Sequence, residues 1–353
     1  MKSLWAVVFI GILMPITSFS QINHEGIPFY NFYPIDSYGL PQETWCITED
    51  YRGIIYLASN SGLLEFDGST WNTYYTDNNS GIRTVAAQPS GRIYAGAVQT
   101  FGYFEPDITG YLEYHSLCPL LEAKDLDFSD VWQVRECDSY IYFHTMLKLF
   151  RYNPKDNSLI TIEAKTDFQL TGSIKNELYV GQGGIGLCKV VEDSLILIPG
   201  GEFFKNKMLY NILPYDDDNI LVSDKFNIYI FNITKGALNR ELTRLFTNNF
   251  SIKDERFYII FRVRGDKYGV STLNKGVYIL NKDGSIHKHF CVDNILPSNV
   301  SYYGIEARNG NLWLGLDNGV VKVENASPFS KLDYNMKNPL SINSINHLGK
   351  TLF

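Results

Sequence analysis

Short runs of alternating apolar and polar residues, separated by turns rich in Gly, Asn and Asp, recur along most of the chain. The clearest unit spans residues 53–67 (GIIYLASNSGLLEFD), and further units begin near Gly91 and Gly310. Alternation with a period of two between turn residues is typical of β-strands. No window shows the i, i+3, i+4, i+7 spacing of a helical repeat. The pattern therefore predicts a chain built from short strands.

The second turn of each unit gives the length of the repeat. It falls near positions 62, 102, 148, 186, 227, 276 and 319, so seven turns are spread over 257 residues and the average step is about 43 residues. A period of about 40–50 residues with several strands per unit is the signature of a β-propeller. Seven copies predict an all-β fold with seven four-stranded blades.

The last unit, which ends near Val323, has no outer strand of its own. An apolar run before the first unit, residues 27–33 (IPFYNFY), has no neighbouring strand to pair with. Pairing this run onto the last blade would join the two ends of the ring and remove an exposed sheet edge. We therefore expect the seventh blade to contain strands from both ends of the propeller.

The pattern restarts after the seventh unit. Residues 327–332 (SPFSKL) resemble the run at 27–33, and residues 344–353 resemble the beginning of the first unit. A partial blade cannot bury its apolar face alone. We interpret residues 327–353 as a linker and the truncated start of a second propeller; a frayed natural C-terminus is the alternative.

The first twenty residues have the pattern of an export signal. Lys2 precedes an apolar stretch at residues 4–16, and residues 18–20 (SFS) form a small-x-small cleavage site. An uncleaved membrane anchor or a buried strand are the alternatives, but the apolar stretch is short for a span of about 20 residues. We expect a signal peptide at residues 1–20 and the propeller at residues 21–326.

Composition and charge exclude some classes of protein. With 45% hydrophobic residues, the chain can bury a large core, which excludes wholesale disorder. A net charge of −7 argues against binding nucleic acid or an anionic membrane through a basic surface. The five cysteines are odd in number and lack C-x-x-C spacing, so they predict neither a disulfide framework nor a zinc site.

Three local motifs could carry chemistry, but each has a plainer interpretation. Residues 181–186 (GQGGIG) match a dinucleotide fingerprint, yet a strand-like run follows them where a helix would be needed. Residues 216–218 (DDD) lack the alternating carboxylates of a calcium loop. His287 and His289 would share a face of a strand, but no third ligand lies nearby in the sequence. We expect no cofactor and no metal.

The first unit resembles the two-component regulator propeller repeat. Residues 48–63 (TEDYRGIIYLASNSGL) carry the resemblance, and residues 66–71 (FDGSTW) strengthen it. It is strong in the first, second and seventh units and thin in the third to fifth, where the first-turn glycine is missing. The family consists of periplasmic sensors, common in Bacteroidetes-type bacteria, in which seven-bladed propellers precede a triple-tyrosine domain, a membrane helix and a histidine kinase or helix-turn-helix output domain.

The resemblance implies a sensor function for this region and no enzyme activity. Binding of a small molecule, such as a carbohydrate, or of a partner protein would send a conformational signal to downstream membrane and output segments that this chain lacks. The resemblance also implies that the chain is the periplasmic ectodomain of an inner-membrane receptor, and that the full-length receptor is a homodimer. From the acidic net charge, we expect no nucleic-acid binding through this region.

Candidate binding residues lie where the innermost strand of each blade begins, because loops there surround the channel mouth. We counted back eleven residues from the first β run of each unit. Large side chains recur at that position or one residue away from it. The candidates are Trp45, Arg83, Trp132, Phe168, Tyr210 and Tyr303. Such side chains suit a sugar-like or aromatic ligand. Packing between neighbouring blades is the alternative interpretation.

Two rival functions are also compatible with the sequence. A periplasmic propeller enzyme, such as a hydrolase or a lyase of the streptogramin-lyase type, would need a histidine and a carboxylate that meet at the channel mouth. The six histidines do not fall at corresponding blade positions, which disfavours an enzyme. A scaffold for protein contacts is the other rival, and a ligand-sized pocket would distinguish a sensor from it.

Overall fold

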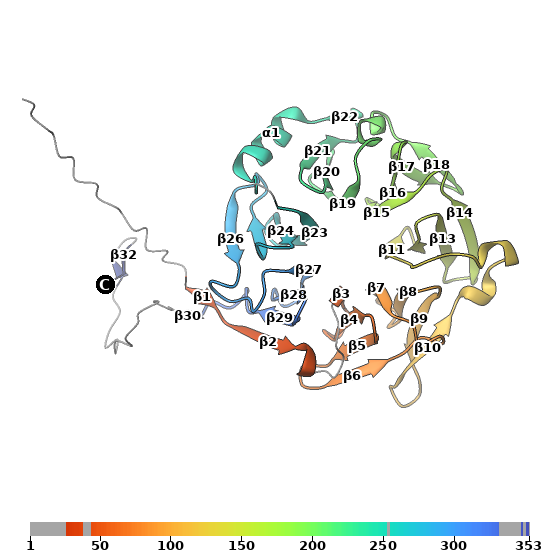
Figure 1. The fold of residues 1–353 in the computed structure, drawn as a ribbon, viewed down its shortest axis with the longest axis horizontal. Helices are drawn as coiled ribbons and strands as arrows, with labels where there is room; N and C mark the ends of the chain where they lie inside the picture. Colours follow the sequence, from red (N-terminus) through yellow and green to blue (C-terminus); the bar gives the residue numbers. More distant parts are fainter. Residues whose placement is uncertain (1–25, 38–43, 253–254, 332–346, 349–350, 353) are drawn as a thin grey trace, which may run out of the picture. The chain divides into compact units, whose positions relative to one another are not determined.

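The computed structural model describes residues 26–37, 44–252, 255–331, 347–348 and 351–352. Residues Pro28–Phe329 form one compact unit. Within it, seven four-stranded antiparallel sheets are arranged as blades around a central axis (Figure 1). The predicted seven-bladed β-propeller is confirmed.

Six blades follow chain order from the innermost to the outermost strand. Blade 1 contains β3 (Thr44–Glu49), β4 (Ile55–Ser59), β5 (Gly62–Phe66) and β6 (Trp71–Tyr74), and blade 2 contains β7 (Ile82–Ala87), β8 (Ile93–Ala97), β9 (Phe101–Pro106) and β10 (Leu112–Ser116). Blade 3 contains β11 (Gln133–Cys137), β12 (Tyr140–His144), β13 (Lys148–Asn153) and β14 (Ser158–Glu163), and blade 4 contains β15 (Phe168–Ile174), β16 (Glu177–Gln182), β17 (Gly186–Val191) and β18 (Ser194–Leu197). Blade 5 contains β19 (Leu209–Pro214), β20 (Asn219–Asp224), β21 (Ile228–Asn232) and β22 (Ala237–Leu238), and blade 6 contains β23 (Phe257–Val263), β24 (Lys267–Thr272), β25 (Val277–Leu280) and β26 (Ile286–Phe290).

Blade 7 combines the two ends of the propeller, as the sequence predicted. Its inner strands are β27 (Ser301–Glu306), β28 (Leu312–Leu316) and β29 (Gly319–Val323), and its outermost strand is β2 (Tyr30–Pro34). β2 pairs antiparallel with β29 along its whole length. Tyr33 stacks on Trp313 of β28 with ring centroids 5.7 Å apart, and it also contacts aromatic rings of blade 1. The ring is therefore closed by side-chain packing as well as by backbone pairing.

The turn positions that define the repeat fall within one residue of the start of the third strand in every blade. Glycine is needed at several of them for a physical reason. At Gly319 the φ angle is +148°, and a side chain there would also overlap the backbone oxygen of Tyr33 in the closing strand. Glycine tolerates such an angle and such an approach. The repeat is therefore visible in the sequence because the turn restricts the residue type.

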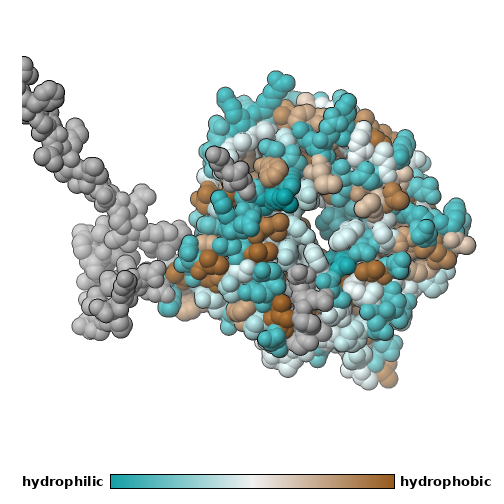
Figure 2. Space-filling model, in the orientation of Figure 1, coloured by the Kyte–Doolittle hydropathy of each residue, from teal (hydrophilic) through white to brown (hydrophobic). Residues whose placement is uncertain are grey.

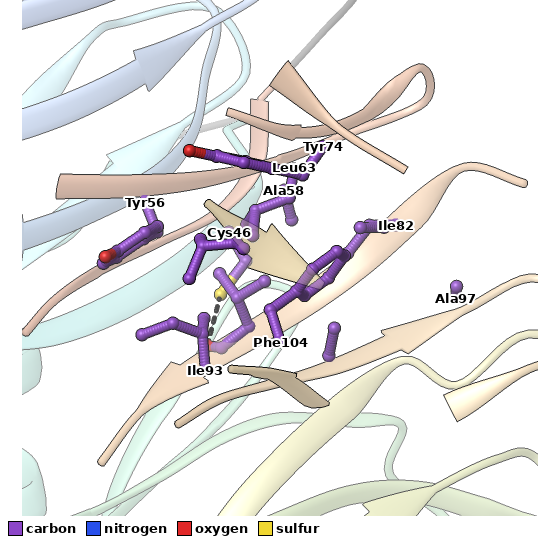
Figure 3. Close-up of a cluster of buried hydrophobic side chains, with 12 residues drawn as sticks. Cys46, Tyr56, Ala58, Leu63, Tyr74, Ile82, Ile93, Ala97 and Phe104 are labelled. Atoms are coloured by element: carbon purple, nitrogen blue, oxygen red, sulfur yellow. Dashed lines mark hydrogen bonds between the residues drawn. The ribbon is translucent and has the colours of Figure 1, made fainter. Parts of the chain in front are cut away.

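The core lies between adjacent blades. In six blades the second strand carries a large aromatic residue that is buried, and these residues are Tyr56, Tyr94, Tyr142, Tyr179, Tyr268 and Trp313. Figure 3 shows one such core, in which Cys46, Tyr56 and Leu63 of blade 1 pack with Ile82, Ile93 and Phe104 of blade 2. The alternation of apolar and polar residues thus places apolar side chains against neighbouring blades.

One helix was not predicted from the sequence pattern. In blade 5 the outermost strand β22 has only two residues, and α1 (Arg240–Asn249) follows it. Asn239 caps the helix, because its Oδ1 accepts a hydrogen bond from the Leu242 amide at 3.2 Å. Phe246 anchors the helix in the core with 1% of its surface exposed. The helix is a single insertion and therefore leaves no trace in a repeat pattern.

Short elements complete the described chain. Four 3-10 helices lie in connections, at Ile35–Ser37, Cys118–Leu120, Ala123–Asp125 and Gly201–Phe204. β1 (Ile27–Pro28) pairs with β30 (Ser330–Lys331), and β31 (His347–Leu348) pairs with β32 (Thr351–Leu352) in an antiparallel hairpin. This hairpin is the start of a further blade, as the restart of the pattern predicted. The predicted signal peptide lies outside the described residues.

Two glycines make room for one aromatic ring between blades 6 and 7. A Cβ atom at Gly269 of β24 or Gly304 of β27 would overlap the ring of Phe261 in β23. We expect Gly304→Ala to lower the free energy of unfolding by about 1–3 kcal/mol, because the overpacked ring must shift. Gly181→Ala in β16 is the control, since its Cβ would meet only side-chain atoms of Leu209, at 3.3 Å, and Leu170, at 3.7 Å. Guanidinium unfolding curves measure both, and equal losses would contradict the prediction.

Candidate ligand-binding site

A β-bulge recurs near the start of the innermost strand in six of the seven blades. In each case the pairing with the second strand skips one residue. The skipped residues are Trp45, Arg83, Gln169, Tyr210, Tyr258 and Tyr302. In blade 3 the corresponding residue is Trp132, which precedes β11 and donates its backbone N–H to the His144 carbonyl at 2.8 Å. Bulges free a residue from the ladder and redirect its side chain, often beside functional sites.

These seven side chains line one cavity of about 510 Å³ at the channel mouth. Figure 2 shows that this unit is hollowed at the centre of the ring, where residues of intermediate hydropathy border the opening. Pockets for small ligands are about 300–1,000 Å³ in volume. The cavity therefore has the size of a small-molecule site, and every blade contributes to it.

Four aromatic rings and one guanidinium form a continuous arc along the wall of the cavity. The ring of Tyr258 lies 5.5 Å from that of Tyr302, which lies 5.6 Å from that of Trp45. The guanidinium of Arg83 lies over the rings of both Trp45 and Trp132, at 5.6 and 5.5 Å. We call these five residues the aromatic arc; they come from blades 6, 7, 1, 2 and 3.

Polar contacts fix the part of the aromatic arc around Arg83. The Arg83 Nε atom lies 2.8 Å from the Asp130 carboxylate, and another guanidinium nitrogen donates to the Asn60 side-chain oxygen. The same Asn60 oxygen accepts a hydrogen bond from the Trp45 indole at 2.9 Å. The side chains of Trp45 and Arg83 are therefore held in place before any ligand arrives, which lowers the entropic cost of binding.

The opposite wall is more adaptable. Gln169 accepts a hydrogen bond from the Leu209 amide at 2.9 Å, and the Tyr210 hydroxyl lies 3.6 Å from the sulfur of Met208. Met146 and Met208 line the same side, and each is more than half exposed. Unbranched methionine side chains adjust to irregular shapes. A rigid aromatic wall thus faces a deformable one.

The floor of the cavity contains Gln133, Arg135 and Tyr303. These three residues, together with Tyr210 and Ile259, also line a second cavity of about 260 Å³ farther along the channel, so they lie between the two cavities. Burial raises the pKa of the Tyr303 hydroxyl well above its ordinary value, and the nearby Cys46 adds to the effect. The tyrosine therefore stays protonated and can donate a hydrogen bond.

His144 lies beside this floor and is 2% exposed. Neither ring nitrogen makes a hydrogen bond of good geometry; the backbone of Phe168 is the polar group that acts on the ring. Burial, and then the positive charge of Arg135, lower the pKa of His144 to about 3. The imidazole is therefore neutral at physiological pH.

All six residues proposed from the sequence line this cavity: Trp45, Arg83, Trp132, Phe168, Tyr210 and Tyr303. Their part in binding stays a prediction. Phe168 is 4% exposed and packs 5.9 Å from the His144 ring, so packing explains its position as well. The sequence register missed Gln169 and Tyr258 by one residue each, and it missed Arg135 and His144 altogether. No fixed count back from the second strand finds the first two, because the second strand starts ten residues after Trp45 in blade 1 but eight residues after Gln169 in blade 4.

The remaining motifs have structural roles. Gly186 begins strand β17, so no helix follows the GQGGIG segment. Asp216 accepts hydrogen bonds from the backbone of Asp218 and Asn219 in a turn. His289 stacks on Tyr278 with ring centroids 3.9 Å apart. Within the ranges that the structure describes, no three metal-ligating side chains gather, and no helix is long and apolar enough to cross a membrane.

No family model and no curated protein matches the chain. Solved structures do match. The extracellular domain assigned to the hybrid two-component system BT3049 from B. thetaiotaomicron has a TM-score of 0.68 and 17% identity, over 92% of this chain and 46% of that one. The corresponding domain of BT4673 from the same organism has a TM-score of 0.64 and 16% identity, over 85% of this chain and 40% of that one. Virginiamycin B lyase from Staphylococcus aureus has a TM-score of 0.62 and 13% identity, over 84% of this chain and 99% of that one.

These likenesses establish the fold. The chain spans less than half the length of the two ectodomains. The two ectodomains are assigned to two-component systems, the kind of protein that the first repeat resembles, as predicted. The lyase shows that a similar fold also serves an enzyme. The chain thus shares its fold with parts of two-component ectodomains and with a lyase.

Proposed function

We propose that this chain is the ligand-binding propeller of an exported, two-component-type sensor, and that a small molecule binds in the cavity bordered by the aromatic arc. The observation that carries the proposal is the repeated bulge, which directs one side chain from each of six blades into one cavity. Packing between blades does not call for bulges in the same place in six sheets.

The ligand best suited to this cavity is sugar-like. Trp45, Tyr258 and Tyr302 offer flat apolar faces on which a sugar ring can stack, and Gln133 and Gln169 offer carboxamides for its hydroxyl groups. Arg83 is positioned to donate hydrogen bonds at the edge of a bound ring. The cavity volume fits one or two sugar units.

Binding would act through the rest of the receptor. The signal-like first twenty residues and the extracellular neighbours support export to the periplasm. In this proposal, ligand binding favours one arrangement of a homodimeric inner-membrane receptor and so changes its output. This chain supplies the binding step.

A binding role fits the cavity better than catalysis or a pure scaffold does. His144 is the histidine that lines the cavity, but no hydrogen bond joins it to a carboxylate among the described residues, as a general-base pair would need. Asp167, which also lines the cavity, is half-buried, and His144 makes no hydrogen bond to it. A flat scaffold face would not need a ligand-sized hollow.

The proposal predicts that removing one ring of the aromatic arc weakens ligand binding. We expect Trp45→Ala to weaken the binding of a sugar ligand at least about tenfold, because stacking area and the contact with Arg83 are both lost. Titrations of neutral and acidic mono- and disaccharides, followed by tryptophan fluorescence and calorimetry, measure this. Tyr51→Ala, at an exposed ring outside the cavity, is the control. Equal weakening in both variants would count against the site.

A further inference from the structure

The floor of the cavity presents a positive charge that no described carboxylate pairs with. Arg135 takes part in none of the ion pairs found among the described residues. Its guanidinium donates a hydrogen bond to the Val134 carbonyl at 3.2 Å and interacts with Tyr303. By contrast, Arg83 on the wall is paired with Asp130 at 2.8 Å. A half-buried guanidinium without a carboxylate partner is poised to receive an anion.

The neighbours of Arg135 on the floor are hydrogen-bond donors. The side-chain oxygen of Gln133 already accepts hydrogen bonds from the backbone and hydroxyl of Thr171, at 2.6 and 2.9 Å, which leaves its amide group to donate. The Tyr303 hydroxyl is protonated, as described above. The acidic side chain that lines the cavity, Asp167, is half-buried, forms none of the ion pairs found among the described residues, and does not line the second cavity beyond the floor.

His144 gives an independent sign that a ligand completes this region. It is a polar side chain, 2% exposed, with two ring nitrogens that lack partners of good geometry, and it lines the cavity. Leaving buried polar atoms unsatisfied costs stability, so natural proteins rarely do it without a reason. A neutral imidazole donates from one nitrogen, so a ligand oxygen on the floor would satisfy it.

We infer that the floor binds the anionic group of the ligand, and that the ligand is therefore an acidic sugar whose carboxylate or sulfate contacts Arg135. This inference rests on the proposed function, because the aromatic arc would hold the sugar ring while the floor holds its charge. Arginine suits this role because its planar guanidinium donates two parallel hydrogen bonds to an oxyanion. Gln133, Tyr303 and His144 would supply the remaining donors.

The test compares sugars that differ in charge but not in shape. The full chain is titrated with D-galacturonate, D-glucuronate and galactose 6-sulfate, and in parallel with galactose, glucose and the methyl ester of galacturonate. We expect at least one acidic sugar to bind about tenfold or more tightly than its neutral counterpart, the difference typical of a hydrogen bond to a charged group. The carboxylate and sulfate arms show which oxyanion the floor prefers.

Substitutions then assign the preference to one residue. We expect Arg135→Gln to abolish the preference for the acidic sugar and Arg135→Lys to keep part of it, whereas Arg308→Gln, at an exposed arginine outside the cavity, leaves it unchanged. Circular dichroism and thermal melting check that each variant folds. If Arg135→Gln does not fold, the comparison of galacturonate with its methyl ester in the unmodified chain decides whether the site prefers the charged sugar.

The outcomes distinguish the acidic-sugar inference from the sugar-binding function. Equal binding of acidic and neutral sugars, or an unchanged preference in a folded Arg135→Gln variant, would overturn the acidic-sugar inference and leave the sugar-binding function standing. Failure of every sugar, acidic and neutral, to bind would overturn both.

Discussion

Deleting residues 22–34 leaves a chain that no longer folds into a closed propeller. The deletion removes β2, which supplies the outer strand of blade 7, and exposes the edge of β29, whose Val320, Val321 and Val323 are fully buried in the intact ring. It also removes Tyr33 from its contacts with Trp313 and blade 1. These losses together are comparable to the about 5–15 kcal/mol that keeps a typical domain folded.

Circular dichroism and thermal melting test this prediction. The shortened chain should show no cooperative melting transition and should aggregate through its open edge. A chain in which residues 30–34 are replaced by a Gly/Ser linker of equal length separates strand pairing from chain length. A synthetic peptide that spans residues 26–36 should restore part of the transition when added in excess. A cooperative transition at the wild-type melting temperature would show that closure does not stabilise the ring.

We expect one buried histidine, His144, to lower the stability of the propeller in acid. The pKa of His144 is about 3 in the folded chain, against about 6.5 for an exposed histidine. Between these two values the unfolded chain binds a proton that the folded chain does not, so stability falls as the pH falls from about 6.5 towards 3. Each pH unit in this window costs up to about 1.4 kcal/mol, or about 3 kcal/mol between pH 6.5 and pH 4.

A variant isolates this contribution. Carboxylates such as Asp107, whose pKa is lowered first by a hydrogen bond from the Thr109 hydroxyl, also lose stabilising contacts in acid, but they do so in every variant. We expect His144→Asn to flatten the dependence between pH 6.5 and pH 4 relative to the wild type. His115→Asn, at an exposed histidine, should leave the dependence unchanged. Urea unfolding curves at several pH values measure the slopes, and identical slopes for all three chains would refute the assignment to His144.

The sequence predicted the blades well because blade structure is set locally. Turn glycines such as Gly319 and the alternation along each strand can be recognised from neighbouring residues alone. The closing strand was found because the last blade lacked an outer strand and the run at residues 27–33 lacked a partner. Helix α1 was missed because an insertion in one blade does not repeat. Its capping residue Asn239 resembles the many turn residues of the chain.

The candidate site was predictable only in part. The type of residue at the channel mouth was visible, as Trp45 and Arg83 show, but the bulge that turns each side chain inward depends on pairing between strands. For this reason the predicted register is off by one at Gln169 and Tyr258. Arg135 and His144 were not predicted, because they stand out only by the polar partners that they lack. Those partners depend on contacts across several blades, which the sequence does not show.

The shared seventh blade has a consequence for the order of synthesis. Pro34 pairs with Gly319, so 285 residues separate the two partners along the chain. At a typical elongation rate of about 5–20 residues per second, β2 waits roughly 15–60 s for its partner to be made. During that interval Tyr30, Phe32 and Tyr33 have no sheet to join. A nascent chain that stalls before residue 323 therefore keeps an open ring with two unpaired edges, whichever blades are already formed.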